Sequence, residues 1–167
     1  VIIITTFVPT LTKEHLVKEK AAELYSDASL IASTYAEQLY RSETSLEEVK
    51  VQLDFLSECA STIIQIINPS GMLILDTTAE IDVENVETIR NFDPTATIGS
   101  YYMVGNFFGT YMEKEMLSVL APITSDYKVK GYVVIHYDMN HITVPFKTIV
   151  DDEGTEVVTD EIDFPIL

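Results

Sequence analysis

The sequence contains no tryptophan, a single cysteine, and ten lysines and arginines against 27 aspartates and glutamates. The one cysteine, Cys59, excludes an intrachain disulfide and every metal or redox motif of the CxxC type. The formal net charge of −17 repels a phosphate backbone and argues against nucleic-acid binding. No apolar run reaches about 18 residues, so no segment of this sequence spans a bilayer by itself.

The motifs of the common enzyme classes are also missing. The sequence has no GxSxG, HExxH, P-loop or GxGxxG pattern. His15, His136 and His141 lack the mutual spacing of metal ligands, and His136 lies in a predicted strand, where a hydrogen-bonded core or surface histidine is expected. Asp54 and Glu58 are one helical turn apart, as solvated carboxylates are on many acidic helices. We therefore expect no enzymatic activity, no cofactor and no metal site in this region.

The remaining composition is that of one globular domain. The 167 residues are 47% apolar and 22% charged, and the length favours a single domain. The acidic residues are spread along the chain rather than clustered before its last segment. They indicate either a solvated surface or a surface that binds a cationic peptide, or Mg²⁺ or Ca²⁺ ions that bridge its carboxylates to anionic lipid headgroups.

A long helix is predicted in the first quarter of the chain. Apolar or small residues alternate at spacings of four and three, which is the pattern of a coiled-coil seam. They are Val17, Ala21, Leu24, Ala28, Ile31, Tyr35 and Leu39. Thr12 is a predicted N-cap, and the absence of Gly and Pro from Lys13 to Arg41 allows a rod of roughly 43 Å. The stripe either packs on the domain's own sheet or also pairs in part with a second copy.

A second helix is predicted after the polar break Ser42–Thr44. Ser45 and Glu48 have the spacing of a capping box. The following apolar positions recur at three and four residues, and they are Leu46, Val49, Leu53, Leu56 and Ala60. Because the connecting loop is short, the two helices are expected to lie roughly antiparallel.

The strand signals begin at residue 63. A β-branched run at Ile63–Ile67 ends at the turn Asn68–Gly71, and Met72–Asp76 returns as a second strand, which predicts a hairpin. Asp82–Arg90 is predicted to be weakly helical, and Asn91–Ser100 to be an irregular loop.

Three further strands are predicted downstream, at Tyr101–Phe108, Met116–Thr124 and Gly131–Tyr137. Ser125–Lys128 is the turn between the last two. Local hairpins imply an antiparallel sheet with the helices on one face. The predicted fold class is α+β, with a long N-terminal helix and a second helix packed on a central antiparallel sheet.

Several segments resemble one known family. Ile64–Thr77 (IQIINPSGMLILDT) is similar to the first hairpin of the single Cache (PAS-like) sensor domains, the extracytoplasmic portions of bacterial membrane histidine kinases. Phe92–Pro94 and Gly99–Phe108 (GSYYMVGNFF) resemble the loop and third strand of such domains in Firmicute kinases. Leu117–Ile123 (LSVLAPI) and Lys130–His136 (KGYVVIH) resemble their closing hairpin. The resemblance covers about Val8 to Ile142.

This resemblance implies a position for the chain and a division into parts. Residues 1–10, which contain VIIITTFV, are expected to be the outer end of a membrane helix or a leading segment; from the residues alone a buried strand is the alternative. Residues 11–142 are expected to form the sensor domain, on the extracellular face of the bacterial cell membrane, as a homodimer through the N-terminal helix. Residues 143–167 depart from the family pattern and are predicted to be an acidic tail with a hairpin at Phe146–Val150 and Glu156–Thr159, whose connection Asp151–Gly154 is interpreted as a turn.

The function implied is ligand sensing by a two-component sensor histidine kinase. The alternatives are the same fold on a chemoreceptor or a diguanylate cyclase, or a structural dimerisation domain without a sensing role. In the family a small ligand lies between the open sheet face and the loop that joins the second and third strands, here about Thr78–Ser100. The partner expected is therefore a small molecule or a cation of unknown identity.

The candidate ligand-binding residues lie in and around this loop. Arg90 lies at the centre of the loop and is predicted to clamp a carboxylate or phosphate, unless it neutralises Glu87 or Asp93. Tyr101 and Tyr102 are neighbours on a predicted strand, so at most one of them faces a given side of the sheet. The further candidates near the next turn are Tyr111 and Lys114.

Overall fold

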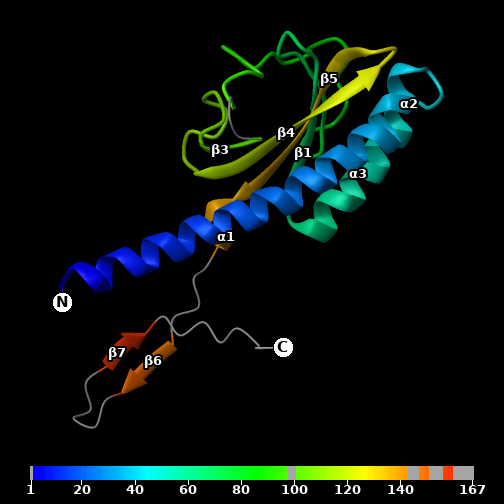
Figure 1. Ribbon diagram of the computed structural model, residues 1–167. Helices are drawn as coiled ribbons and strands as arrows, with labels where there is room; N and C mark the ends of the chain where they lie inside the picture. Colours follow the sequence, from blue (N-terminus) through cyan, green and yellow to red (C-terminus); the bar gives the residue numbers. More distant parts are fainter. Residues whose placement is uncertain (1, 98–100, 143–146, 151–155, 160–167) are drawn as a thin grey trace.

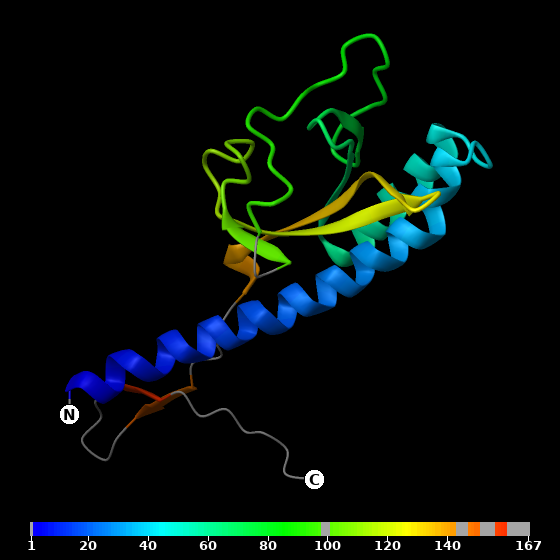
Figure 2. The ribbon, with the colours of Figure 1, turned by 45° about the horizontal axis from the view of Figure 1, so that its top comes forward.

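The computed structural model describes residues 2–97, 101–142, 147–150 and 156–159. A five-stranded antiparallel sheet has the strand order β2-β1-β5-β4-β3. Its strands are β1 (Ile63–Ile67), β2 (Leu73–Asp76), β3 (Tyr102–Gly105), β4 (Met116–Ser125) and β5 (Lys128–Asp138). The helices cover one face of this sheet, and the long loops lie over the other face (Figures 1 and 2). The predicted α+β architecture is confirmed.

The N-terminal helix is longer than predicted. α1 (Ile2–Ile31) continues through a π-helical turn (Ala32–Ala36) into α2 (Glu37–Tyr40). The prediction of Thr12 as an N-cap is wrong, because the chain before it is already helical, and the strand alternative for the first residues is wrong for the same reason. None of the described helices combines the length and the apolar character that a membrane crossing requires.

The seam of α1 packs on the domain's own sheet. Val17, Ala21, Leu24, Ala28 and Ile31 are buried. They contact a helix-side core formed mainly by the strands β1, β4 and β5. The first turns of α1 extend beyond the sheet (Figures 1 and 2). The first interpretation of the stripe is therefore confirmed for this part, and pairing with a second copy stays a prediction.

The second helix begins and ends close to where the sequence indicates. In α3 (Leu46–Ala60) the Ser45 Oγ accepts from the Glu48 N–H at 3.2 Å, and the Glu48 carboxylate accepts from the Ser45 N–H at 3.3 Å. The predicted capping box is therefore present. Val49 and Leu53 are buried against α1 and the sheet.

The first hairpin is confirmed, but the helix predicted after it is absent. The carboxylate of Asp82 accepts from the backbone N–H groups of Glu84 and Asn85, which offers this segment a turn in place of a helix. Farther along, the Ile89 N–H donates to the Gly71 carbonyl at 2.8 Å. A Cβ at Gly71 would lie 2.9 Å from the Ile89 carbonyl oxygen, so only glycine permits this close approach.

A second, separate hairpin is formed by β6 (Lys147–Val150) and β7 (Glu156–Thr159), which pair antiparallel. This agrees with the strands predicted for the acidic tail. The predicted turn Asp151–Gly154 lies outside the described residues.

One buried hydroxyl has no hydrogen-bond partner among the described residues, that of Tyr40. It lies where a Cβ at Gly131 would be only 2.8 Å away, so nothing larger than glycine fits beside it. Because an unpaired buried polar group costs about 1–3 kcal/mol, we expect Tyr40→Phe to raise the free energy of unfolding by about 1 kcal/mol and the melting temperature by roughly 2–4 °C. Thermal unfolding checks this, with Tyr127→Phe in an exposed turn as the neutral control. A less stable Tyr40→Phe would contradict it.

Candidate functional site

The sheet face opposite the helices carries a second, smaller core. Ile67, Phe107, Leu120 and Val134 are buried there, and side chains from the loops pack against them. The loop that follows β2 and the segment that follows β3 cover this face (Figure 2). This is the region in which the family resemblance implies a ligand.

A chain of four polar side chains crosses this face. The Gln65 side-chain amide donates to Asp76 Oδ2 at 2.6 Å, and the Gln65 Oε1 lies 2.9 Å from His136 Nε2. An amide oxygen only accepts, so the proton of the neutral imidazole is on Nε2. His136 Nδ1 is then the acceptor for the Ser118 hydroxyl at 2.7 Å. The hydrogen bonds therefore run in one direction, from Ser118 to the Asp76 carboxylate.

His136 is completely buried within this chain. Burial lowers the pKa of its imidazole to about 3, while the nearby Asp76 charge acts weakly in the opposite direction. The rings of Phe107 and Tyr111 lie edge-on to the imidazole, with centroids at 4.5 and 5.0 Å. His136 is thus a neutral, hydrogen-bonded core residue that orients its neighbours, as expected for a histidine in a strand.

A cavity of about 320 Å³ opens beside Asp76, where this row of hydrogen-bonded side chains ends. Its lining comes from β1, β2, the loop after β2 and the segment after β3: Gln65, Leu73, Asp76, Glu87, Thr88, Ile89, Arg90, Phe108, Gly109 and Thr110. Asp76 is held in place because its Oδ1 accepts from the backbone N–H and the hydroxyl of Thr78, at 2.7 and 2.6 Å. The cavity therefore combines an anchored carboxylate with an apolar wall.

Arg90 also lines this cavity. Among the described residues no carboxylate lies within ion-pair distance of it, Glu87 and Asp93 included. The Asp93 carboxylate instead accepts from the backbone N–H and the hydroxyl of Thr95. Arg90 is consequently free to bind an anion in the cavity.

The other sequence-predicted residues lie outside this cavity. Tyr111 is half-buried beside His136, and burial, assisted by the Asp76 charge, raises the pKa of its phenol well above the usual value. It lines a neighbouring pocket of about 290 Å³ together with Lys114, whose Nζ lies 3.8 Å from Asp138 Oδ2. These two residues are therefore near the site but do not share its lining with Arg90.

The two adjacent tyrosines belong to the other side of the sheet. The Tyr101 ring lies 4.9 Å from the Tyr25 ring of α1, and Tyr102 packs against the helix-side core. They do not alternate across the sheet because β3 begins only at Tyr102. Neither residue lines the Arg90 cavity.

Sequence reasoning did not single out Gln65, Asp76 and Ser118. The available signal was a polar residue in a mostly apolar strand, within β1 and β4 for Gln65 and Ser118 and at the end of β2 for Asp76. Among the described residues no group of three or more His, Cys, Asp or Glu side chains is arranged to hold a metal ion. The candidate site is a cavity lined by hydrogen-bonding, charged and apolar groups.

Neither a protein-family model nor a curated protein matches the sequence. Solved structures of a Campylobacter jejuni chemoreceptor, Tlp3, do match. Its ligand-binding domain in complex with L-valine has a TM-score of 0.51 and 11% identity, covering 78% of this chain and 57% of that one. The complex with 4-methylisoleucine has a TM-score of 0.54 and 13% identity, covering 87% and 64%.

The sensory domain of the same chemoreceptor gives a TM-score of 0.56 at 11% identity and covers 92% of this chain and 72% of that one. The chain thus spans between 57% and 72% of the length of these domains. At this level of identity the similarity concerns the fold. The chain has the α+β fold of these bacterial sensory domains.

Proposed function

We propose that this chain is an extracytoplasmic ligand-sensing domain and that the cavity beside Asp76 binds a small zwitterion, an α-amino acid with an aliphatic side chain. The observation that carries the proposal is one cavity lined by both Asp76, whose carboxylate is anchored, and Arg90, which has no ion-pair partner among the described residues. The first suits an ammonium group and the second a carboxylate. Leu73, Ile89 and Phe108 provide the apolar wall for the side chain.

The structural neighbours support this ligand class. Two of them are complexes of a chemoreceptor domain with L-valine and with 4-methylisoleucine, which both combine an α-amino acid group with a branched aliphatic chain. The same chemistry matches the charges and the apolar wall of the cavity described here. The domain itself would act by binding rather than by catalysis.

We infer that the signal leaves through α1. Ligand binding favours one packing of the sheet on the long helix, and the shift in population needs only a difference in affinity of a few kcal/mol between two packings. A homodimer formed along the turns of α1 that extend beyond the sheet would carry the displacement to a membrane anchor. In this proposal the domain lies on the extracellular face of the bacterial membrane.

The output module we propose is a two-component histidine kinase, in line with the resemblance of the hairpins. A chemoreceptor is the second candidate, favoured by the three structural neighbours described above, which come from a chemoreceptor. Incubation of the full-length protein in membranes with ATP separates the two. Phosphate transfer to a histidine supports the kinase, and its absence favours the chemoreceptor.

Thermal unfolding against a panel of amino acids, organic acids and divalent cations tests the ligand. A ligand at 100 times its dissociation constant adds about 2.7 kcal/mol, which corresponds to roughly 5–10 °C. We expect the largest rise with an aliphatic L-amino acid. Arg90→Ala should weaken its binding about tenfold, because the ligand carboxylate loses its partner.

Arg41→Ala is the matched control, since Arg41 pairs with Glu37 on α2 and lies outside the cavity. A response to Mg²⁺ or Ca²⁺ alone would transfer the proposal to the acidic surface. No response to any amino acid would refute amino-acid binding at this cavity.

A further inference from the structure

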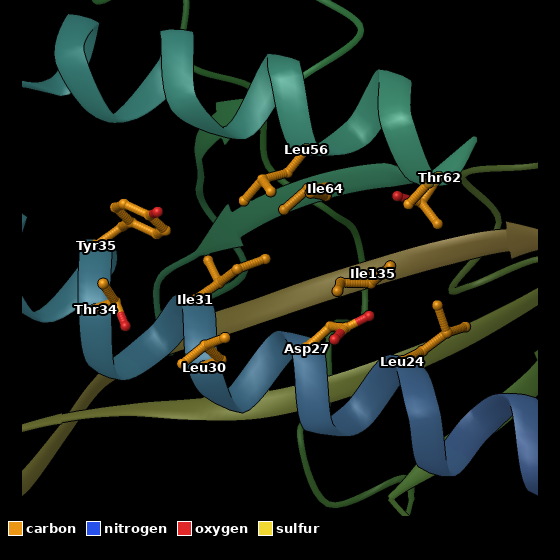
Figure 3. Close-up of a pocket in the computed structure, with 11 residues that line it drawn as sticks. Leu24, Asp27, Leu30, Ile31, Thr34, Tyr35, Leu56, Thr62, Ile64 and Ile135 are labelled. Atoms are coloured by element: carbon orange, nitrogen blue, oxygen red, sulfur yellow. The ribbon is translucent and has the colours of Figure 1, made fainter.

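A second cavity lies on the opposite face of the sheet, between the two helices. It measures about 300 Å³, roughly twice the volume of an engineered protein cavity that binds benzene. Figure 3 shows Leu56 of α3 above Ile31 of α1, with Ile135 of β5 to the right of them. Its lining is Leu24, Asp27, Leu30, Ile31, Thr34, Tyr35, Leu56, Ala60, Thr62, Ile64 and Ile135. We call this space the interhelical groove.

The groove is open to solvent in spite of its apolar lining. Leu30 is 63% exposed beside it, although it lies on a helix whose neighbouring seam residues are buried. Covering such a leucine with another apolar group is favourable, by about 25 cal/mol for each Å² of apolar surface removed from water. The groove therefore has the character of a ligand pocket rather than of a packed helix contact.

One wall of the groove comes from the π-helical turn Ala32–Ala36. Thr34 and Tyr35 project from this turn to the groove. Single π-helical turns inside α-helices are rare and occur frequently at functional sites, because the inserted residue redirects the side chains around it. The irregular turn thus directly follows the last turns of α1, whose residues Leu24, Asp27, Leu30 and Ile31 line the same groove.

The charge in the groove defines the chemistry of its occupant. Asp27 is the one charged residue of the lining, and its carboxylate has no hydrogen bond or ion pair with any residue that the structure describes. No Lys, Arg or His of the described part of the chain lines the groove, and the whole chain carries a net charge of −17. An apolar chain with a cationic end complements both features, whereas a fatty acid would be repelled.

We propose that the interhelical groove is a second binding site, which takes a small amphiphilic amine with its aliphatic chain between Leu56 and Ile31 and its ammonium group at Asp27. This site is independent of the cavity beside Asp76, from which the sheet separates it. An occupant would contact the last turns of α1 and the π-helical turn that follows them. It therefore acts on the same helix through which we infer that the sensory signal leaves.

Methyl NMR of the whole chain tests the site with n-octylamine, 1-octanol and octanoate as probes. We expect octylamine to shift the methyl signals of Leu30, Ile31, Leu56 and Ile135 and to bind on the order of ten times more tightly than octanoate. Asp27→Asn should weaken octylamine about threefold and leave octanol unchanged, since an exposed ion pair contributes little. Asp126→Asn in the β4–β5 turn is the control with the same change of charge.

Ala60→Leu fills the groove from its rim and should abolish binding of all three probes, whereas Ala22→Leu, at an exposed position of α1 outside the groove, should not. Equal affinities for the three probes would overturn the assignment of an amine. Shifts confined to residues around Asp76, or binding that survives Ala60→Leu, would overturn the site. If a probe only promotes self-association of the protein, the groove is a contact surface between two copies of the chain, and the proposal is overturned as well.

Discussion

Asp76→Asn is expected to lower the affinity for the amino acid about 100-fold, which corresponds to roughly 2.7 kcal/mol. The asparagine keeps the size of the side chain but loses the charge that attracts the ammonium group. Isothermal titration calorimetry measures the change, with Asp126→Asn as the control for net charge. An unchanged affinity would exclude Asp76 from the site.

The variant should remain folded because the buried row of hydrogen bonds from Ser118 to residue 76 can reverse its donor-to-acceptor direction. The asparagine amide would donate to Gln65 Oε1 if the Gln65 side chain turns over, and the Gln65 NH₂ would then donate to His136 Nε2. The imidazole proton moves to Nδ1, which donates to the Ser118 hydroxyl. The ¹⁵N shifts of His136 report this change of tautomer, from Nε2–H in the parent chain to Nδ1–H in the variant. If His136 has the same tautomer in the parent protein and in the variant, the assigned direction of these hydrogen bonds is wrong.

The second large effect concerns pH. The imidazole of His136 has a pKa of about 3 in the folded chain, below the ordinary value of 6.5. Between these two pH values the unfolded chain binds a proton that the folded chain does not. The contribution of His136 to the free energy of unfolding is therefore fully present above about pH 6.5 and decreases as the pH falls below it. The slope is about 1.4 kcal/mol per pH unit, and we expect a loss of about 2 kcal/mol from pH 7 to pH 5.

Urea unfolding of the parent chain and His136→Gln at pH 7, 6 and 5 isolates this contribution. The variant keeps the exposed His15 and His141, so the two proteins differ only in the buried imidazole. The stability difference between them should shrink by about 2 kcal/mol as the pH decreases. Parallel pH curves would mean that His136 does not stay neutral in the folded chain.

The elements that local chemistry specifies could be predicted from the sequence. The capping box at Ser45 and Glu48 marks the start of α3, and the turn Asn68–Gly71 marks the first hairpin. The start of α1 was not predictable in this way. Thr12 has the side chain of an N-cap, but the N–H groups that follow it belong to a helix that is already formed.

The site depends on contacts between distant segments, which local patterns do not contain. Gln65 and His136 are 71 residues apart and meet because β1 pairs with β5. Ser118 and His136 stand directly opposite each other in the register of β4 and β5. Each residue alone is a polar interruption in an apolar strand, and only the sheet order joins the three. Arg90 could be proposed as a candidate because a cation is rare in this sequence and this one lies in the loop that the family resemblance indicates.

The central claim is that the cavity between Asp76 and Arg90 holds the amino acid. A crystal structure of the chain with the amino acid that raises its melting temperature most tests it directly. We predict the ammonium group within hydrogen-bond distance of the Asp76 carboxylate, the ligand carboxylate at the Arg90 guanidinium and the side chain against Phe108. A ligand bound anywhere else, or the same cavity occupied by solvent at saturating ligand, would contradict the account.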